Sequence, residues 1–115
     1  MFSVGTRARI LLCTEPTDMR KSFGGLSALA KNQLDENPLE GQYFVFINRR
    51  KTMMKVLYFE PSGYCLWNKR LEQGQFPVRS SASGRRWLSW SDLQLILDGI
   101  EVQKSRQLKR YKHNP

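Results

Sequence analysis

The sequence of 115 residues has few of the residues that build metal centres and catalytic triads. It contains two cysteines, Cys13 and Cys65, and a single histidine, His113. Two isolated thiols have neither the spacing of a metal site nor the number of a disulfide framework, so we expect both to be reduced and buried. A lone histidine close to the C-terminus cannot act as the base of a triad that is held in a core.

Long hydrophobic runs are also missing. The longest apolar run is five residues, 43–47, which is too short to cross a membrane as a helix. The N-terminus has no hydrophobic region of a signal peptide, so we expect a cytoplasmic protein. Gly-rich phosphate loops and the G-x-S-x-G motif are absent, and most acids have helix-end or turn explanations. We therefore expect no catalysis, no cofactor, no metal ion and no small-molecule substrate.

Acidic residues are outnumbered by basic ones. The chain has 19 Lys and Arg against 10 Asp and Glu, a net charge of +9. Residues 1–40 are balanced, whereas residues 41–90 carry nine basic groups and two acidic ones. A basic half beside a neutral half favours a polyanionic partner, nucleic acid before an anionic membrane surface. The alternative is that the excess charge serves only solubility.

Hydrophobic patterning predicts a single α+β domain over residues 1–102. We expect an antiparallel sheet of four to five strands, one longer N-terminal helix and one short C-terminal helix. The segment 43–48 is apolar on both faces, which predicts a central strand. Further strands are predicted at 8–13, 53–60 and 64–70. Met19, Phe23, Leu26 and Ala30 mark the buried stripe of the first helix, with Thr17 or Asp18 as its cap.

The C-terminal third is less regular. Residues 77–86 are rich in Ser, Gly and Arg and are predicted to form a mobile loop. Ser89 and Asp92 fit a capping box, and Gly99 is placed to stop the short helix that follows. Ile100 and Val102 could return to the sheet. The segment 103–115 is predicted to be a disordered tail, either solvated or lying along phosphates through its cations: Lys104, Arg106, Lys109, Arg110 and Lys112.

The first candidate phosphate site is the start of the first helix. Arg20 and Lys21 follow Asp18 there, where cations oppose the helix dipole. With the free backbone N–H groups of the turn they could bind an anion. Alternatively, Arg20 pairs with Glu15 or Asp18. The glycine pair 24–25 inside this helix predicts either a close approach of another group or a bend.

Further basic groups follow the predicted strands. Arg49, Arg50 and Lys51 form an exposed, mobile loop tip, with Lys55 in the next strand. A later group contains Lys69, Arg70, Arg79, Arg85 and Arg86. Both groups are candidates for binding nucleic acid, or they are simply solvated. Three tryptophans lie among these cations and could stack on bases, but we assign them to a partner surface: Trp67, Trp87 and Trp90.

Several of these segments resemble one family. They are Pro16–Leu26, Phe44–Arg50, Lys55–Leu57, Gly63–Phe76 and Leu95–Ile100. In this order they resemble the TnpB accessory proteins of insertion sequence family 66, over about residues 10–100. The resemblance implies a small bacterial protein that is encoded beside a separate DDE transposase and is needed for transposition. It implies no established activity and no catalytic residue.

Together these observations predict a non-catalytic accessory protein for transposition. We expect it to bind DNA mainly through phosphates and to contact the transposase or a second accessory protein. Such binding predicts weak sequence preference and a steep salt dependence. The alternatives are a pure protein-interaction module of the transposition complex and a nuclease. The DNA hypothesis requires that the cations of residues 41–90 gather on one side of the molecule.

Overall fold

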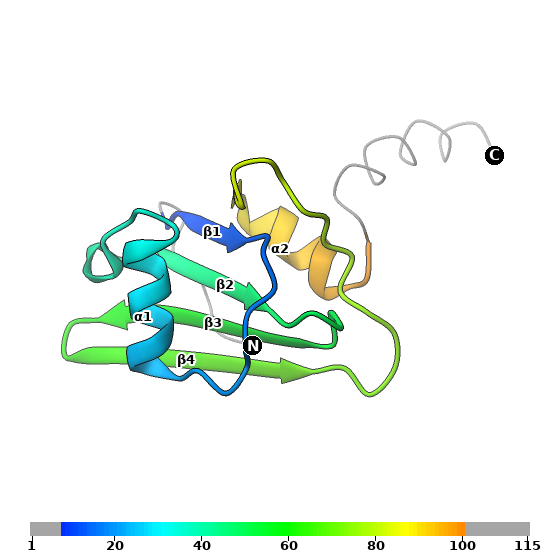
Figure 1. The fold of residues 1–115 in the computed structure, drawn as a ribbon, viewed down its shortest axis with the longest axis horizontal. Coiled ribbons are helices and arrows are strands. Elements are labelled where there is room, and N and C mark those ends of the chain that lie inside the picture. The colour runs from blue at the N-terminus through cyan, green and yellow to red at the C-terminus, as the bar shows by residue number, and fades with distance from the viewer. Residues whose placement is uncertain (1–7, 101–115) are drawn as a thin grey trace.

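The computed structural model describes residues 8–100 as one mixed β-sheet with a helix on each face (Figure 1). The predicted tail and Val102 lie outside the described residues. The elements, in chain order, are β1 (Ile10–Cys13), α1 (Phe23–Asn32), a 3-10 turn η1 (Pro38–Glu40), β2 (Tyr43–Ile47), β3 (Met53–Glu60), β4 (Gly63–Arg70), β5 (Arg85–Leu88) and α2 (Trp90–Leu97).

The five strands of the described region lie in the order β4-β3-β2-β1-β5. The α+β class is confirmed, and β2 is the central strand, as its two apolar faces predict. Three of the neighbouring pairs are antiparallel, but β1 and β2 are parallel. The parallel pair arises because the chain returns from β1 to β2 through α1, a crossover that reverses its direction twice.

Alternate strand residues point to opposite faces, and each face has its own core. On one face β2 residues Phe44 and Phe46 pack with Leu26 and Ala30 of α1. On the other face the core joins β1, β2 and β3 to α2 through residues that are almost fully buried: Ile10, Leu12, Val45, Met54, Val56, Leu93 and Ile96. The sheet is therefore covered on both sides, and its loops gather at its two ends.

The first helix is shorter than predicted. It begins at Phe23 with Ser22 as its N-cap, and no side chain caps it. The preceding loop is held on the sheet instead, because the Thr17 N–H donates to the Ile47 carbonyl at 2.9 Å. Asp18 accepts hydrogen bonds from Arg20 and does not cap the helix. Phe23, predicted to be buried, is 45% exposed as a result of this later start.

The C-terminal third contains a strand that was not predicted, and its first two residues fall in the predicted 77–86 loop. Strand β5 pairs antiparallel with β1, although two of its four residues are arginines. The capping box of α2 is confirmed: Asp92 N–H donates to Ser89 Oγ at 3.0 Å, and Ser89 N–H donates to Asp92 Oδ2 at 3.1 Å. Gly99 has φ +81°, the left-handed conformation expected of a helix stop. Ile100 is not in a strand.

Candidate nucleic-acid interface

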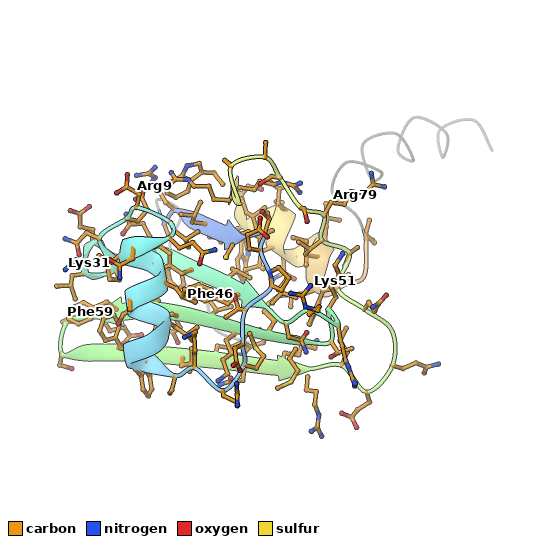
Figure 2. All side chains as sticks on the ribbon, viewed as in Figure 1. Arg9, Lys31, Phe46, Lys51, Phe59 and Arg79 are labelled. Atoms are coloured by element: carbon orange, nitrogen blue, oxygen red, sulfur yellow. The ribbon has the colours of Figure 1, made fainter. Side chains whose placement is uncertain are left out.

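Topology brings many of the cations to one end of the sheet. We call it the basic end: β1, β2 and β4 finish there, and β3 and β5 begin there. Figure 2 shows Lys51 and Arg79 toward this end and Lys31 and Phe59 toward the other. Apart from those of β5, the cations at or beside the basic end are Arg20, Lys21, Arg49, Arg50, Lys51, Lys55, Lys69, Arg70 and Arg79.

Acids are distributed differently. Those that accompany the cations at the basic end are Glu15, Asp18, Glu72 and Asp98. The far end, where β2 begins and β3 finishes, carries Asp35, Glu36, Glu40 and Glu60. The described molecule is therefore electrically polar, with a positive excess at the basic end. A field of this shape attracts a polyanion to one end.

Lys21 and Lys55 meet on the α1 face of the sheet. Lys55 lies in β3 opposite Phe46, so its side chain points to the α1 face, where its Nζ donates to the Lys21 carbonyl at 2.8 Å. The stem of Lys21 packs on α1: a Cβ added at Gly25 would lie 3.1 Å from Lys21 Cβ and Cγ. This is one of the two alternatives that the glycine pair predicts, a close approach, and it occurs at Gly25; a Cβ at Gly24 would meet open space.

Strand β4 contributes one cation to each face. Arg70 lies opposite Met53 and shares the α1 face with Lys55, whereas Lys69 lies opposite Met54 and points to the α2 face. Arg70 Nε is 3.0 Å from Glu72 Oε2, and both side chains are largely exposed. An exposed pair of this kind is worth at most about 1 kcal/mol, so a phosphate can replace the carboxylate.

The β2–β3 turn is more ordered than the predicted mobile loop. Lys51 has φ +60°, and its ammonium group donates to the Val78 carbonyl. The Lys51 carbonyl accepts from Phe76 N–H at 2.7 Å, and the Arg50 carbonyl accepts from Gln75 Nε2 at 2.7 Å. These bonds fix the turn on the 71–78 loop and leave the side chains of Arg49 and Arg50 exposed.

Asn48 organises this turn and was missed by the sequence analysis. Its Oδ1 accepts from the N–H groups of Thr52 at 2.9 Å and Met53 at 3.0 Å, and its Nδ2 donates to Thr52 Oγ1. An asparagine at the end of a strand, directly before a basic turn, is the signal that could have identified it. Asn48 thus fixes the turn that carries the two arginines.

Arg20 adopts the alternative arrangement considered from the sequence, a pair with Asp18. Its Nη2 is 2.6 Å from Asp18 Oδ2, and its backbone N–H donates to Oδ1 at 2.9 Å. These hydrogen bonds from Arg20 lower the pKa of the Asp18 carboxyl from 3.8 to about 2. Arg20 is therefore paired directly with a carboxylate, whereas Lys21 makes no ion pair with a described residue and adds only a smaller electrostatic lowering of the Asp18 pKa.

Apart from Lys51, whose ammonium group donates to the Val78 carbonyl, five cations of the basic end have no ion-pair partner among residues 8–100. No described carboxylate lies within 4.0 Å of their charged nitrogens. They come from the loop before α1, the β2–β3 turn, β3 and β4, and are Lys21, Arg49, Arg50, Lys55 and Lys69. Their charge is available to an external anion.

The β5 cations start at the same end of the sheet, because Arg85 lies opposite Cys13, but they lie on the outer strand farthest from β4. Arg85 is half-buried; it donates to the Leu34 carbonyl at the end of α1 and lies 3.3 Å from Glu36. Arg86 lies opposite Leu12 and points to the α2 face. Because β1, β2 and β3 separate β5 from β4, these two arginines are remote from Lys69 and Arg70.

The three tryptophans do not form one surface. Trp67 and Trp90 are partly buried and pack against the core on the α2 side. Trp87 lies opposite Leu11 on the α1 face, is 37% exposed, and has the Arg9 guanidinium 4.0 Å from its ring centre. The predicted partner surface is therefore divided between the two faces of the sheet.

Within the described range, the remaining groups of interest are few. No cluster of three His, Cys, Asp or Glu side chains there could hold a metal ion. Cys13 is buried and Cys65 half-buried, both as free thiols, and burial raises the pKa of Cys13. None of the helices between residues 8 and 100 combines the length and the hydrophobicity that a membrane crossing requires.

Comparison with known proteins places the chain in a family. Two proteins of Sinorhizobium fredii, y4hO and y4jC, both described as uncharacterized, are 36% and 32% identical to it. The first match covers 96% of each chain, and the second covers 81% of this chain and 80% of the relative. No solved structure matches. The family model described as IS66 Orf2-like protein matches residues 8–107. The chain therefore belongs to the IS66 Orf2-like family, which indicates an accessory role in transposition.

Proposed function

We propose that this protein serves transposition by binding DNA through phosphate contacts at its basic end. The observation that carries the proposal is the gathering there of cations without carboxylate partners among the described residues: Lys21, Arg49, Arg50, Lys55 and Lys69. Such a group can neutralise several phosphates and release the counterions that they hold. Because the chain belongs to the IS66 Orf2-like family, DNA is the polyanion that we expect it to meet.

The arrangement favours phosphates over base edges. The cations project from two strands, a turn and a loop, whereas base readout in the major groove commonly uses an inserted helix or ribbon. Contacts of this type position DNA and carry little sequence information. If the five cations each neutralise one phosphate of a duplex, the logarithm of the affinity falls with the logarithm of salt with a slope of about −4.5.

Contact with the transposase, or with another accessory protein, is the second part of the proposal. Leu39 is 55% exposed in η1 and lines a groove of about 660 Å³ between α1 and residues 35–39. This groove is at the far end, so a protein partner seated there would leave the basic end open to DNA. The proposal includes neither a membrane nor a small-molecule partner.

The decisive experiment is a fluorescence-anisotropy titration of labelled duplexes at two salt concentrations. One duplex carries a terminal repeat of the element, and the other is a random sequence of equal length. Two double variants remove cations from the basic end, Lys21→Ala with Lys55→Ala and Arg49→Ala with Arg50→Ala. Each is expected to weaken the binding of both duplexes to the same extent and to reduce the salt slope by about 2. Lys31→Ala, an exposed cation at the far end, is the matched control and keeps the slope.

Two outcomes would overturn the DNA proposal. One is no binding of either duplex at about 100 mM salt, where phosphate-driven contacts still register. The other is an equal loss per charge removed from the Lys31 control, which would show that net charge matters and its position does not. Retention of the chain by purified transposase without any DNA binding would favour the protein-interaction module.

A further inference from the structure

The two outer strands of the sheet differ in how they are protected. Strand β5 has only four residues, two of them arginines. Strand β4 has eight residues, and its register with β3 runs without interruption from Gly63 to Arg70. Short length, charge, proline and bulges are the devices that prevent an edge strand from pairing with another chain. From Tyr64 to Trp67, β4 has none of them.

The backbone groups of β4 that face away from β3 can be identified from the ladder. The β3–β4 hairpin pairs Glu60 with Gly63, and the ladder continues past the strands with Leu71 N–H donating to the Thr52 carbonyl at 2.7 Å. In an antiparallel pair, alternate residues exchange hydrogen bonds with the partner strand. The odd-numbered residues of β4 therefore bond to β3. The even-numbered ones, Tyr64, Leu66 and Asn68, direct their N–H and C=O groups outward, and no other described strand lies there.

We propose that a second copy of this chain pairs with this edge, β4 against β4 in the antiparallel direction. The charges along the strand select both the partner and the direction. Lys69 and Arg70 lie at one end of β4, and Glu60 lies beside its other end, across the hairpin. An antiparallel copy centred on Leu66 places Lys69 opposite the partner's Gly63, with the partner's Glu60 one strand further along the same face, whereas a parallel copy would place the cations side by side. Opposite charges across a strand pair stabilise it, and like charges destabilise it.

The symmetry of this pair follows from its direction. Two antiparallel copies of one strand are related by a two-fold axis, here near Leu66 and perpendicular to the sheet. Both α1 helices then lie on the same side of one continuous sheet. Figure 1 shows the first turn of α1 on the β4 side of the sheet, and Phe23, its first residue, is 45% exposed. The two basic ends point in opposite directions. The proposal concerns self-association alone and does not depend on DNA binding.

Hydrogen exchange on the full chain tests the edge directly. At low concentration, the amides of Cys65, Trp67 and Lys69 are expected to be protected by β3, and those of Leu66 and Asn68 to exchange quickly. Across a roughly hundredfold rise in protein concentration, Leu66 and Asn68 should gain protection, in step with dimer formation in sedimentation velocity. If these two amides still exchange quickly at the highest concentration, the proposal is overturned.

A substitution at one position separates pairing from folding. Asn68→Pro removes an outward N–H group that makes no bond to β3, so the edge strand can retain its fold while losing the partner. Asn68→Thr is the matched control, because it keeps the N–H group and suits a strand. The proline variant should sediment as a monomer where the threonine variant and the parent chain dimerise, with an unchanged far-UV circular dichroism spectrum. Dimerisation of a folded proline variant would refute the β4 interface. If the proline variant is unfolded, the exchange pattern of the parent chain decides.

Discussion

The basic end and the β5 edge use the same side chains in different ways. At the β5 edge, Arg85 reaches the end of α1 and the Glu36 carboxylate, and Arg9 lies over the ring of Trp87. At the basic end, Lys21 and Lys55 meet without any carboxylate of the described region in ion-pair range. The first group closes the fold, and the second leaves positive charge unneutralised.

This difference shows why net charge alone was an incomplete guide to function. An arginine that joins the end of a helix to an edge strand stabilises the fold and offers little to a ligand. A lysine whose stem packs on a glycine and whose charge has no counter-ion adds little to stability, and its charge is available to a ligand. The cations of residues 41–90 therefore divide into structural and available ones, and mutations should separate the two groups.

The largest effect is expected from Arg85→Ala. The variant loses the hydrogen bond to the Leu34 carbonyl and leaves the Glu36 carboxylate, 17% exposed, without its cation. Leaving such groups unpaired costs about 2 kcal/mol. Urea unfolding followed by circular dichroism should show this loss, whereas Arg49→Ala should stay within about 0.5 kcal/mol of the parent. Equal stability of the two variants would contradict the division of the cations.

The sequence predicted the elements whose pattern is local. Four strands, the central place of β2 and the capping box of Ser89 and Asp92 all depend on neighbouring residues, and the structure confirms them. The turn after β2 was placed correctly, although its order was underestimated. The glycine pair predicted either a close approach or a bend, and a close approach occurs at Gly25.

Features that depend on distant segments could not be predicted. Strand β5 has only four residues, and it is a strand because β1 offers it an edge. The parallel pairing of β1 and β2 depends on how α1 crosses the sheet. For the candidate site, the sequence grouped Arg85 with Lys69 and Arg70, but strand order separates them. Sequence distance cannot show which cations are neutralised by carboxylates from another element.

The two glycines of α1 provide a smaller test at the basic end. Gly24→Ala should stabilise the protein by about 0.5–1 kcal/mol, because alanine favours the helix and its Cβ meets nothing within 4 Å. Gly25→Ala should gain less or lose stability, because its Cβ would press on the stem of Lys21 at 3.1 Å. Thermal unfolding of both variants measures the difference. If both stabilise equally, the Lys21 stem is free to move and the close packing has no energetic role.

Removing the Arg9 guanidinium that lies over the ring of Trp87 should change the stability still less. The Arg9 Cζ lies 4.0 Å from the ring centre, and Trp87 is 37% exposed. A cation–π contact at an exposed site contributes about 0.5 kcal/mol. Arg9→Ala should therefore lower stability by about this amount and leave the salt slope of DNA binding unchanged, whereas Arg9→Lys should retain part of the contact. A marked fall in the DNA salt slope of Arg9→Ala would place Arg9 among the available cations.

The smallest effect concerns Arg20, which belongs to the basic end but has the counter-charge of Asp18. Because hydrogen bonds from Arg20 hold the folded pKa of Asp18 at about 2, below the ordinary 3.8, the stability from this pair is present above pH 3.8. It is lost as the pH falls through about 2. Carboxyl-carbon NMR should find this pKa, and Arg20→Gln should move it back toward 3.8.

The same pair predicts how Arg20 and Lys21 differ toward DNA. Asp18→Asn removes the counter-charge and makes Arg20 available, so this variant should bind duplexes more tightly and show a steeper salt slope, by at most about 1. Lys21→Ala should reduce the slope more than Arg20→Ala does, because only Lys21 begins without an acidic partner among the described residues. Equal slopes for the two alanine variants would mean that phosphate displaces Asp18 without cost, and the pairing would then not distinguish structural cations from available ones.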